Sequence, residues 1–168
     1  MKALHEISQA VVWKHWKQLE NATAWNIHAD IRDPLPADTQ WYSAEIEPED
    51  IDSMYVISSG DWLNIAGNSF SVKNVLKRLN MPTHNENTKR ISDDIRQKIA
   101  HLNSGGKLDS RLIAVTESKG FDGSFTFIDG NRRSISFLET NTLIGTNIYL
   151  GVSSSMKKYK WANQTYSQ

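Results

Sequence analysis

The sequence predicts an α/β fold, because short strand-like runs alternate with helix-like segments along most of the chain. Runs rich in β-branched and aromatic residues are typical of strands, and they occur at 41–46, 54–57, 111–116, 125–128 and 148–152. In the helix-like segment 89–102, apolar residues recur every three or four positions, as Ile91, Ile95, Ile99 and Leu102. We therefore expect a mixed small sheet flanked by helices, in a compact domain of the α+β type.

The first 39 residues are expected to form a helical arm, and residues 40–168 the main domain. Apolar residues at steps of three and four predict an amphipathic helix, with the stripe Leu4, Ile7, Val11, Val12, Trp16 and Leu19. The sequence RDPLPADT then predicts a loop that ends the arm, because its prolines and aspartates interrupt regular structure. The helix face either packs on the core of the domain or joins two copies of the chain in a homodimer.

Capping and breaking residues indicate the remaining elements. Pro48 in EPEDID is placed to open one helical turn, and Ser71 can cap a helix that runs through Leu79. The segment DWLNIAGNSF is interpreted as a turn followed by a short strand. A polar loop, THNENT, leads to the helix at 89–102, which the run SGG should stop.

Composition excludes several classes of function. The chain has 168 residues with 19 basic and 19 acidic side chains, so no global field draws it to nucleic acid or anionic lipid. It has no cysteine, which excludes disulfides, thiolate metal sites and cysteine nucleophiles. No run of about 18 apolar residues could span a bilayer, and the start MKALHEISQAVVWKHW lacks the features of a signal peptide. We expect a cytoplasmic protein with no membrane partner.

A strand and a helix are predicted to meet inside the segment FTFIDGNRRSISF. Asp129, Gly130 and Asn131 stand at the corner, and Arg132 and Arg133 follow them. A helix N-terminus offers unpaired backbone N–H groups and a partial positive charge, and a glycine there lets an anion approach the backbone. An arginine can add bidentate contacts to phosphate, and an aspartate can act as a general base or hold magnesium. The corner is therefore a candidate phosphate site.

The same residues also fit an ordinary turn. Asp129 and Gly130 could form the turn and the helix cap, while the two arginines pair with surface carboxylates. The chemistry of these residues alone leaves both interpretations open.

The segment DGNRRSISF resembles the arginine-containing box of the ParB/sulfiredoxin superfamily. The resemblance extends over residues 50–152 in the order and spacing of the elements. It implies a central strand at 125–128 that ends in a short glycine motif at a helix start. In that superfamily the glycine and arginine of the motif bind nucleotide phosphates, and these roles would fall to Gly130 and Arg133.

Differences from each branch of the superfamily narrow the expected function. Arg132 matches the ParB box G-E-R-R, but Asn131 stands where that box has glutamate. Sulfiredoxins read G-C-H-R, and their activity is excluded because this chain has no cysteine. Asp129 matches the aspartate that precedes the glycine in free-serine kinases of this fold. Only 35 residues follow Arg133, too few for the DNA reader and dimerisation region of a ParB partition protein, so partition is not expected.

The first hypothesis is a nucleotide-binding ParB-like enzyme, a kinase or nucleotide hydrolase that uses magnesium and a nucleoside triphosphate or diphosphate. Gly130, Asn131, Arg132 and Arg133 would form the phosphate cradle, and Asp129 would be the catalytic base or a magnesium ligand. One of three alternating glutamates could supply a second carboxylate, namely Glu45, Glu47 or Glu49.

The alternative is a non-catalytic module that binds nucleic acid or protein, or a ParB-like nuclease, of a bacterial or mobile-element system. The tail SSSMKKYKWANQTY favours nucleic acid, because lysines among aromatic rings could contact phosphates and stack on bases. These contacts would come from Lys157, Lys158, Lys160 and Trp161. The same tail could instead be a solvated edge with an anchoring tryptophan.

Three residues near the end of the arm have the chemistry of metal ligands. His28, Asp30 and Asp33 stand close together in NIHADIRD. The segment is predicted to be a loop whose polar side chains face solvent, so these residues are not part of the expected site.

Overall fold

Six strands form one mixed sheet in the computed structural model, which describes residues 1–20 and 22–162. The strands are β1 (Lys2–Ile7), β2 (Gln40–Glu45), β3 (Met54–Val56), β4 (Ile113–Thr116), β5 (Phe125–Asp129) and β6 (Asn147–Val152). Their order in the sheet is β1-β2-β6-β4-β5-β3, with parallel pairs β4–β6 and β3–β5 and antiparallel pairs elsewhere. The α/β class predicted from the sequence is confirmed.

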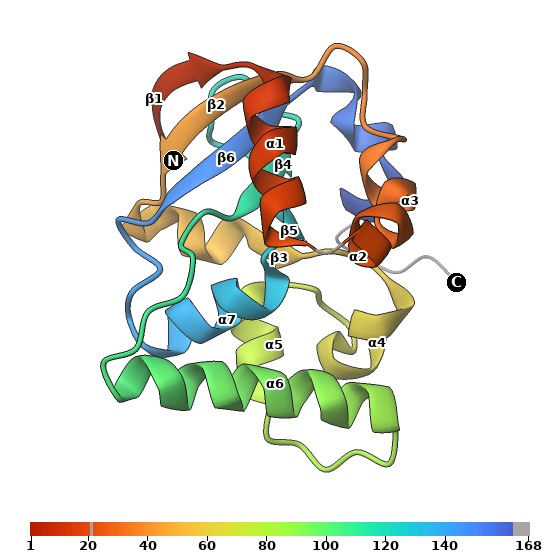
Figure 1. Cartoon of the computed structure of the whole chain (residues 1–168), viewed down its shortest axis with the longest axis vertical. Helices are drawn as coiled ribbons and strands as arrows, with labels where there is room; N and C mark the ends of the chain where they lie inside the picture. The colour runs from red at the N-terminus through yellow and green to blue at the C-terminus, as the bar shows by residue number, and fades with distance from the viewer. Residues whose placement is uncertain (21, 163–168) are drawn as a thin grey trace.

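Helices cover both faces of this sheet (Figure 1). One face carries α1 (Gln9–Leu19), α2 (Ala22–Ile27) and α3 (Ala29–Arg32), with the 3-10 turns η2 (Ser154–Lys158) and η3 (Lys160–Ala162). The other carries α4 (Gly60–Ala66), α5 (Val72–Arg78), α6 (Glu86–Asn103), α7 (Asn131–Glu139) and the 3-10 turn η1 (Pro48–Ser53). None of the described helices is both long and apolar enough to cross a lipid bilayer.

The residues around β4 show how the sheet separates two cores. Leu112 and Ala114 belong to the cluster that packs against α4–α7, whereas Ile113 and Val115 belong to the cluster that packs against α1. All four are buried, because successive side chains of a strand point to opposite faces and both faces are covered.

The prediction of a helix at the N-terminus is wrong for the first residues of the chain. Residues 2–7 form the edge strand β1, which pairs with β2, and the helix begins only with α1. Val12 and Trp16 of the predicted stripe are buried in the core, whereas Leu4 and Val11 are exposed. Pairing with β2 satisfies backbone groups of residues 2–7, and helical spacing in the sequence could not reveal that long-range contact. The predicted arm therefore adds a strand to the sheet.

Two further segments are helical, contrary to the prediction. DWLNIAGNSF was expected to be a turn and a strand, but most of it forms α4, because Trp62, Ile65 and Ala66 bury one helical face. NIHADIRD, expected to be a loop, contains the end of α2 and all of α3.

Other predicted elements are confirmed within a few residues. η1 begins at Pro48, and the Ser71 hydroxyl accepts a hydrogen bond from the Asn74 N–H and so caps α5. The helix predicted at 89–102 lies inside α6. The strand predicted at 125–128 is β5, which lies inside the sheet between β4 and β3.

Candidate functional site at the β5–α7 junction

The junction between β5 and α7 is one residue long. Gly130 lies between Asp129 and Asn131 in a left-handed conformation, with φ +78°. A Cβ atom here would lie 2.4 Å from Leu112 Cδ2, so both the backbone and the packing require glycine. The first intrahelical bond of α7 joins the Ser134 N–H to the Gly130 carbonyl (2.8 Å), and the N–H groups before it have no intrahelical acceptor.

Arg133 connects this junction to the loop before β4. Its Nη2 donates to Asp129 Oδ2 (2.8 Å), and its Nη1 donates to the carbonyl oxygens of Asp109 (3.0 Å) and Arg111 (3.3 Å). The side chain is only 14% exposed. Arg133 is thus occupied by internal contacts, and a phosphate could reach it only by displacing some of them.

The two residues between Gly130 and Arg133 fix the start of α7 on its neighbours. Asn131 Oδ1 accepts a hydrogen bond from the Ile57 N–H (2.9 Å), just after β3. Arg132 Nη1 pairs with Asp94 Oδ2 on α6 (3.2 Å), and the Arg132 side chain is 36% exposed. Arg132 is therefore the more accessible of the two arginines.

Glu20, which follows α1, adds a second carboxylate that the sequence analysis missed. Its Oε1 accepts hydrogen bonds from Trp16 Nε1 (3.0 Å) and from Nδ1 of His28, the N-cap residue of α3. Its Oε2 is buried and has no hydrogen-bond partner within the described residues, and the side chain is 9% exposed. Glu20 lies off the apolar stripe of α1, so the pattern classed it with the solvent-facing residues and gave no signal of its burial.

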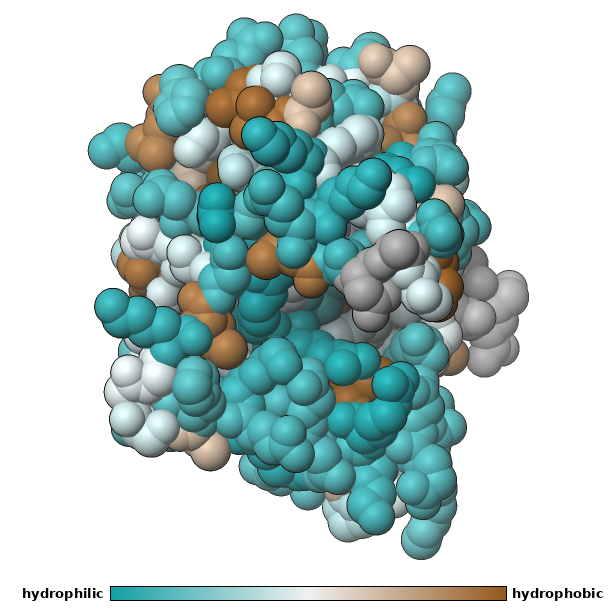
Figure 2. Space-filling view, viewed as in Figure 1, coloured by the Kyte–Doolittle hydropathy of each residue, from teal (hydrophilic) through white to brown (hydrophobic). Residues whose placement is uncertain are grey.

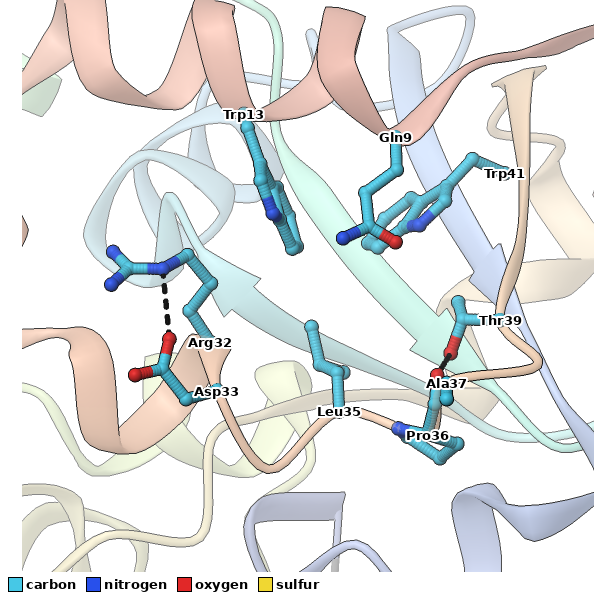
Figure 3. Close-up of a pocket in the computed structure, with 9 residues that line it drawn as sticks. All are labelled: Gln9, Trp13, Arg32, Asp33, Leu35, Pro36, Ala37, Thr39 and Trp41. Atoms are coloured by element: carbon cyan, nitrogen blue, oxygen red, sulfur yellow. Dashed lines mark hydrogen bonds and ion pairs between the residues drawn. The ribbon is translucent and has the colours of Figure 1, made fainter.

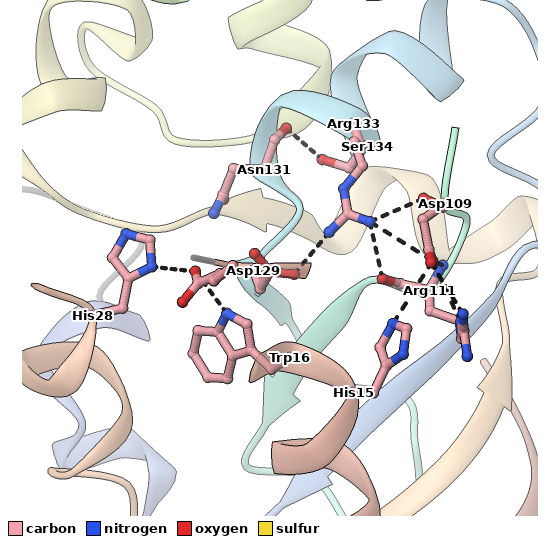
Figure 4. A network of polar contacts seen from close by, with 10 residues as sticks. His15, Trp16, His28, Asp109, Arg111, Asp129, Asn131, Arg133 and Ser134 are labelled. Atoms are coloured by element: carbon pink, nitrogen blue, oxygen red, sulfur yellow. Dashed lines mark hydrogen bonds and ion pairs between the residues drawn. The ribbon is translucent and has the colours of Figure 1, made fainter. Parts of the chain in front are cut away.

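The charged side chains around the junction change one another's pKa values. Burial raises the pKa of Asp129 above its ordinary value; the positive charge of Arg133 opposes this, while the negative charge of Glu20 acts in the same direction as burial. The hydrogen bond to Glu20 raises the pKa of His28, although burial of the ring opposes it. Figure 4 shows Asp129 with His28 and Trp16 on one side and Arg133 on the other. The arrangement places a protonatable carboxyl group beside a second, buried carboxylate.

The molecular surface has a hollow near the β5–α7 junction. Figure 2 shows a hollow between α1 and α7, bordered mainly by hydrophilic residues. A polar ligand could therefore approach the junction from solvent.

Trp161 of the C-terminal tail lies close to the same junction, and residues 163–168 of that tail lie outside the described part of the chain. The Trp161 carbonyl accepts a hydrogen bond from the Ser58 N–H (3.1 Å), one residue after the Ile57 N–H that binds Asn131. Trp161 Nε1 donates to the Asp30 carbonyl (2.8 Å), so the ring is anchored next to α3. Tyr159 of the tail is buried, whereas the three lysines are exposed, namely Lys157, Lys158 and Lys160.

The side chains at the junction do not form a cage for a resident metal ion. Within the described residues, no three His, Asp or Glu side chains gather in an arrangement that could hold one. Asp129 pairs with Arg133, His28 with Glu20, and Asp33 with Arg32 (3.1 Å). Asp129 is already paired with Arg133, and the magnesium ligand expected at this carboxylate stays a prediction. Glu47, a candidate second carboxylate, pairs with the N-terminal amine (3.2 Å).

A separate pocket of about 150 Å³ lies between α1 and the loop after α3 (Figure 3). Its walls include the indole rings of Trp13 and Trp41. Several of its polar groups already bond to one another, as Arg32 Nε does to Asp33 Oδ1 (3.1 Å). Trp41 Nε1, by contrast, is buried and has no hydrogen-bond partner within the described residues.

Searches of protein-family models, curated proteins and solved structures found no match to this chain.

Proposed function

We propose that this protein binds the phosphate groups of a nucleotide at the β5–α7 junction and transfers or hydrolyses the terminal phosphoryl group. The observation that carries the proposal is the buried Asp129 carboxyl group, which lies beside the start of a helix and has a raised pKa. Perturbed carboxyl groups in polar hollows are typical of acid–base catalysts. Asp129 would supply and recover a proton during the reaction.

The start of α7 supports phosphate binding. The N–H groups of Asn131 and Arg132 precede the helical hydrogen-bond ladder and carry the positive end of the helix dipole. Arg132 is the accessible arginine, and a phosphate could replace Asp94 as its partner. Arg133, in contrast, would hold Asp129 in place and not contact the ligand.

Magnesium enters this proposal only as an ion carried by the nucleotide. Magnesium in such sites is commonly held by substrate phosphates, water and one or two carboxylates. A cytoplasmic location and a ParB-like relationship belong to the same proposal, and both rest on the sequence features described above.

A second candidate is a module that binds nucleic-acid phosphates without chemistry. It is favoured by one observation: Lys160 and Trp161 of the tail bond through their backbone carbonyls to Ser58, next to the Ile57 N–H that binds Asn131, and the Lys160 side chain is exposed. The anchoring of Trp161 on Asp30 leaves its ring less free to stack on a base than the sequence suggested.

Thermal shift measurements separate the two candidates. The full chain is titrated with ATP, ADP, GTP and CTP, each with and without magnesium, and with single-stranded DNA. A nucleotide at 100 times its dissociation constant should add about 2.7 kcal/mol to the free energy of unfolding. A shift with DNA alone would favour the binding module, and no shift with any nucleotide would contradict the proposed function.

A further inference from the structure

We infer that Glu20 is the general base that activates the attacking water in a nucleotide hydrolysis reaction at this junction. The inference rests on the proposed function and narrows it, because it makes water the acceptor of the phosphoryl group.

The unpartnered oxygen of Glu20 carries the inference. Buried carboxylate oxygens almost always accept hydrogen bonds, because the loss of water is otherwise uncompensated. Glu20 Oε2 is buried and has no such donor within the described residues, although Oε1 of the same group has two. The free oxygen therefore fits a donor that arrives with the ligand, and a water molecule or a hydroxyl group meets this need.

Two neighbours hold Glu20 in place for this role. Trp16 is 1% exposed, and its indole N–H fixes one carboxylate oxygen from α1. His28 binds the same oxygen from the start of α3. This hydrogen bond raises the pKa of His28, and the negative charges of Asp129 and Asp30 act in the same direction. Both donors bind Oε1, so the lone pairs of Oε2 stay available to take a proton. Trp16 and His28 are positioning residues, and Glu20 is the residue that would contact the water.

The two carboxyl groups together account for every proton of the step. The water oxygen forms a bond to the terminal phosphorus, and one water proton passes to Glu20 Oε2. The bond from phosphorus to the leaving oxygen breaks, and its electron pair stays on that oxygen. In this scheme Asp129 enters the step in its protonated form and gives its proton to the leaving oxygen, and the proton on Glu20 later returns to Asp129 through solvent. Nothing is oxidised or reduced, and the products are inorganic phosphate and the shortened nucleotide.

The test compares Glu20→Gln, Glu20→Ala and Glu117→Gln in the full chain. Glu117 is exposed just after β4 and serves as the matched control. Phosphate release from ATP, GTP and CTP is measured for each variant, and nucleotide affinity is measured by calorimetry. Glu20→Gln should lower turnover by about 10²- to 10⁴-fold and leave affinity unchanged, because a general base contributes a factor of this size. Glu117→Gln should behave like the wild type.

Rescue separates a base from a structural residue. Glu20→Ala leaves space for a small carboxylate, so added formate should restore part of its phosphate release but none of that lost in Asp129→Asn. Wild-type turnover in Glu20→Gln, or hydrolysis that formate fails to restore in a folded Glu20→Ala, would overturn the role of Glu20 and leave nucleotide binding standing. If the wild type binds nucleotide but releases no phosphate, the role of Glu20 is likewise overturned and nucleotide binding stands. A wild type that binds no nucleotide would overturn this inference together with the proposed function.

Discussion

The guanidinium group of Arg133 lies 2.8 Å from the carboxylate of Asp129, and both side chains are largely withdrawn from solvent. Asp129 ends β5 and Arg133 lies in the first turn of α7, so the pair closes the strand–helix corner. Nη1 of Arg133 donates to two backbone carbonyls before β4. The arginine therefore stabilises the corner and sets the charge around Asp129.

Replacement of Arg133 should destabilise the fold more than replacement of its neighbour. Arg133→Ala removes charge-assisted hydrogen bonds from a mostly buried group, which should cost about 1.5 to 3 kcal/mol in the free energy of unfolding. Arg132→Ala removes a more exposed ion pair with Asp94 and should cost under about 1 kcal/mol. Urea denaturation of both variants provides the comparison. Equal losses would show that Arg133 is not the main contact of the corner.

A pair of glycine variants tests the packing of the corner. Gly130 and Gly145 both have positive φ angles, +78° and +80°, but only Gly130 has a close neighbour, Leu112. Gly145→Ala should cost about 1 to 2 kcal/mol through backbone strain. Gly130→Ala should cost a further 1 to 3 kcal/mol or so, because the new methyl group meets Leu112 Cδ2. Thermal unfolding measures both changes, and a smaller loss for Gly130→Ala than for Gly145→Ala would be inconsistent with this packing.

Buried His15 should make the protein sensitive to acid. Burial lowers the pKa of His15 below its ordinary value of 6.5, and the charges of Arg111 and Arg133 act in the same direction, while Asp109 opposes them. The unfolded chain therefore binds a proton more readily than the folded chain, so this contribution to stability is lost as the pH falls below about 6.5.

The variant His15→Phe tests this effect, because the ring packs edge to face on Tyr149 and neither of its nitrogens makes a hydrogen bond within the described residues. The variant also removes the contact of Nε2 with Asp109 Oδ1, at 3.7 Å. Urea denaturation at pH 7.5 and pH 5.5 should show a smaller loss of stability for the variant than for the wild type. The same loss in both proteins would mean that His15 does not titrate on unfolding.

The local part of the site could be predicted from the sequence. The change of period inside FTFIDGNRRSISF places a strand end, a glycine and a helix start in succession, and the structure has them at β5, Gly130 and α7. Short-range patterns succeed here because the turn depends on residues within the segment itself. The partners of Arg133 were not predictable, because Asp109 and Arg111 lie more than 20 residues away in the chain.

The other half of the site depends on contacts that no local pattern contains. Glu20 bonds to His28 at the start of α3, and the segment around His28 was expected to be a loop. The tail then reaches the same region through the bond from Trp161 to Asp30, 131 residues apart. A polar residue at a helix end gives no sign in the sequence that such distant segments will cover it.

The most direct test of the account is nucleotide binding and phosphate release by Asp129→Asn. The amide keeps the shape of the side chain but cannot release and recover a proton, so we expect calorimetry to show nearly wild-type affinity for the nucleotide. Phosphate release should fall by about 10²-fold or more, the usual contribution of an acid–base group. Phosphate release at the wild-type rate in Asp129→Asn, with the nucleotide bound, would contradict the account.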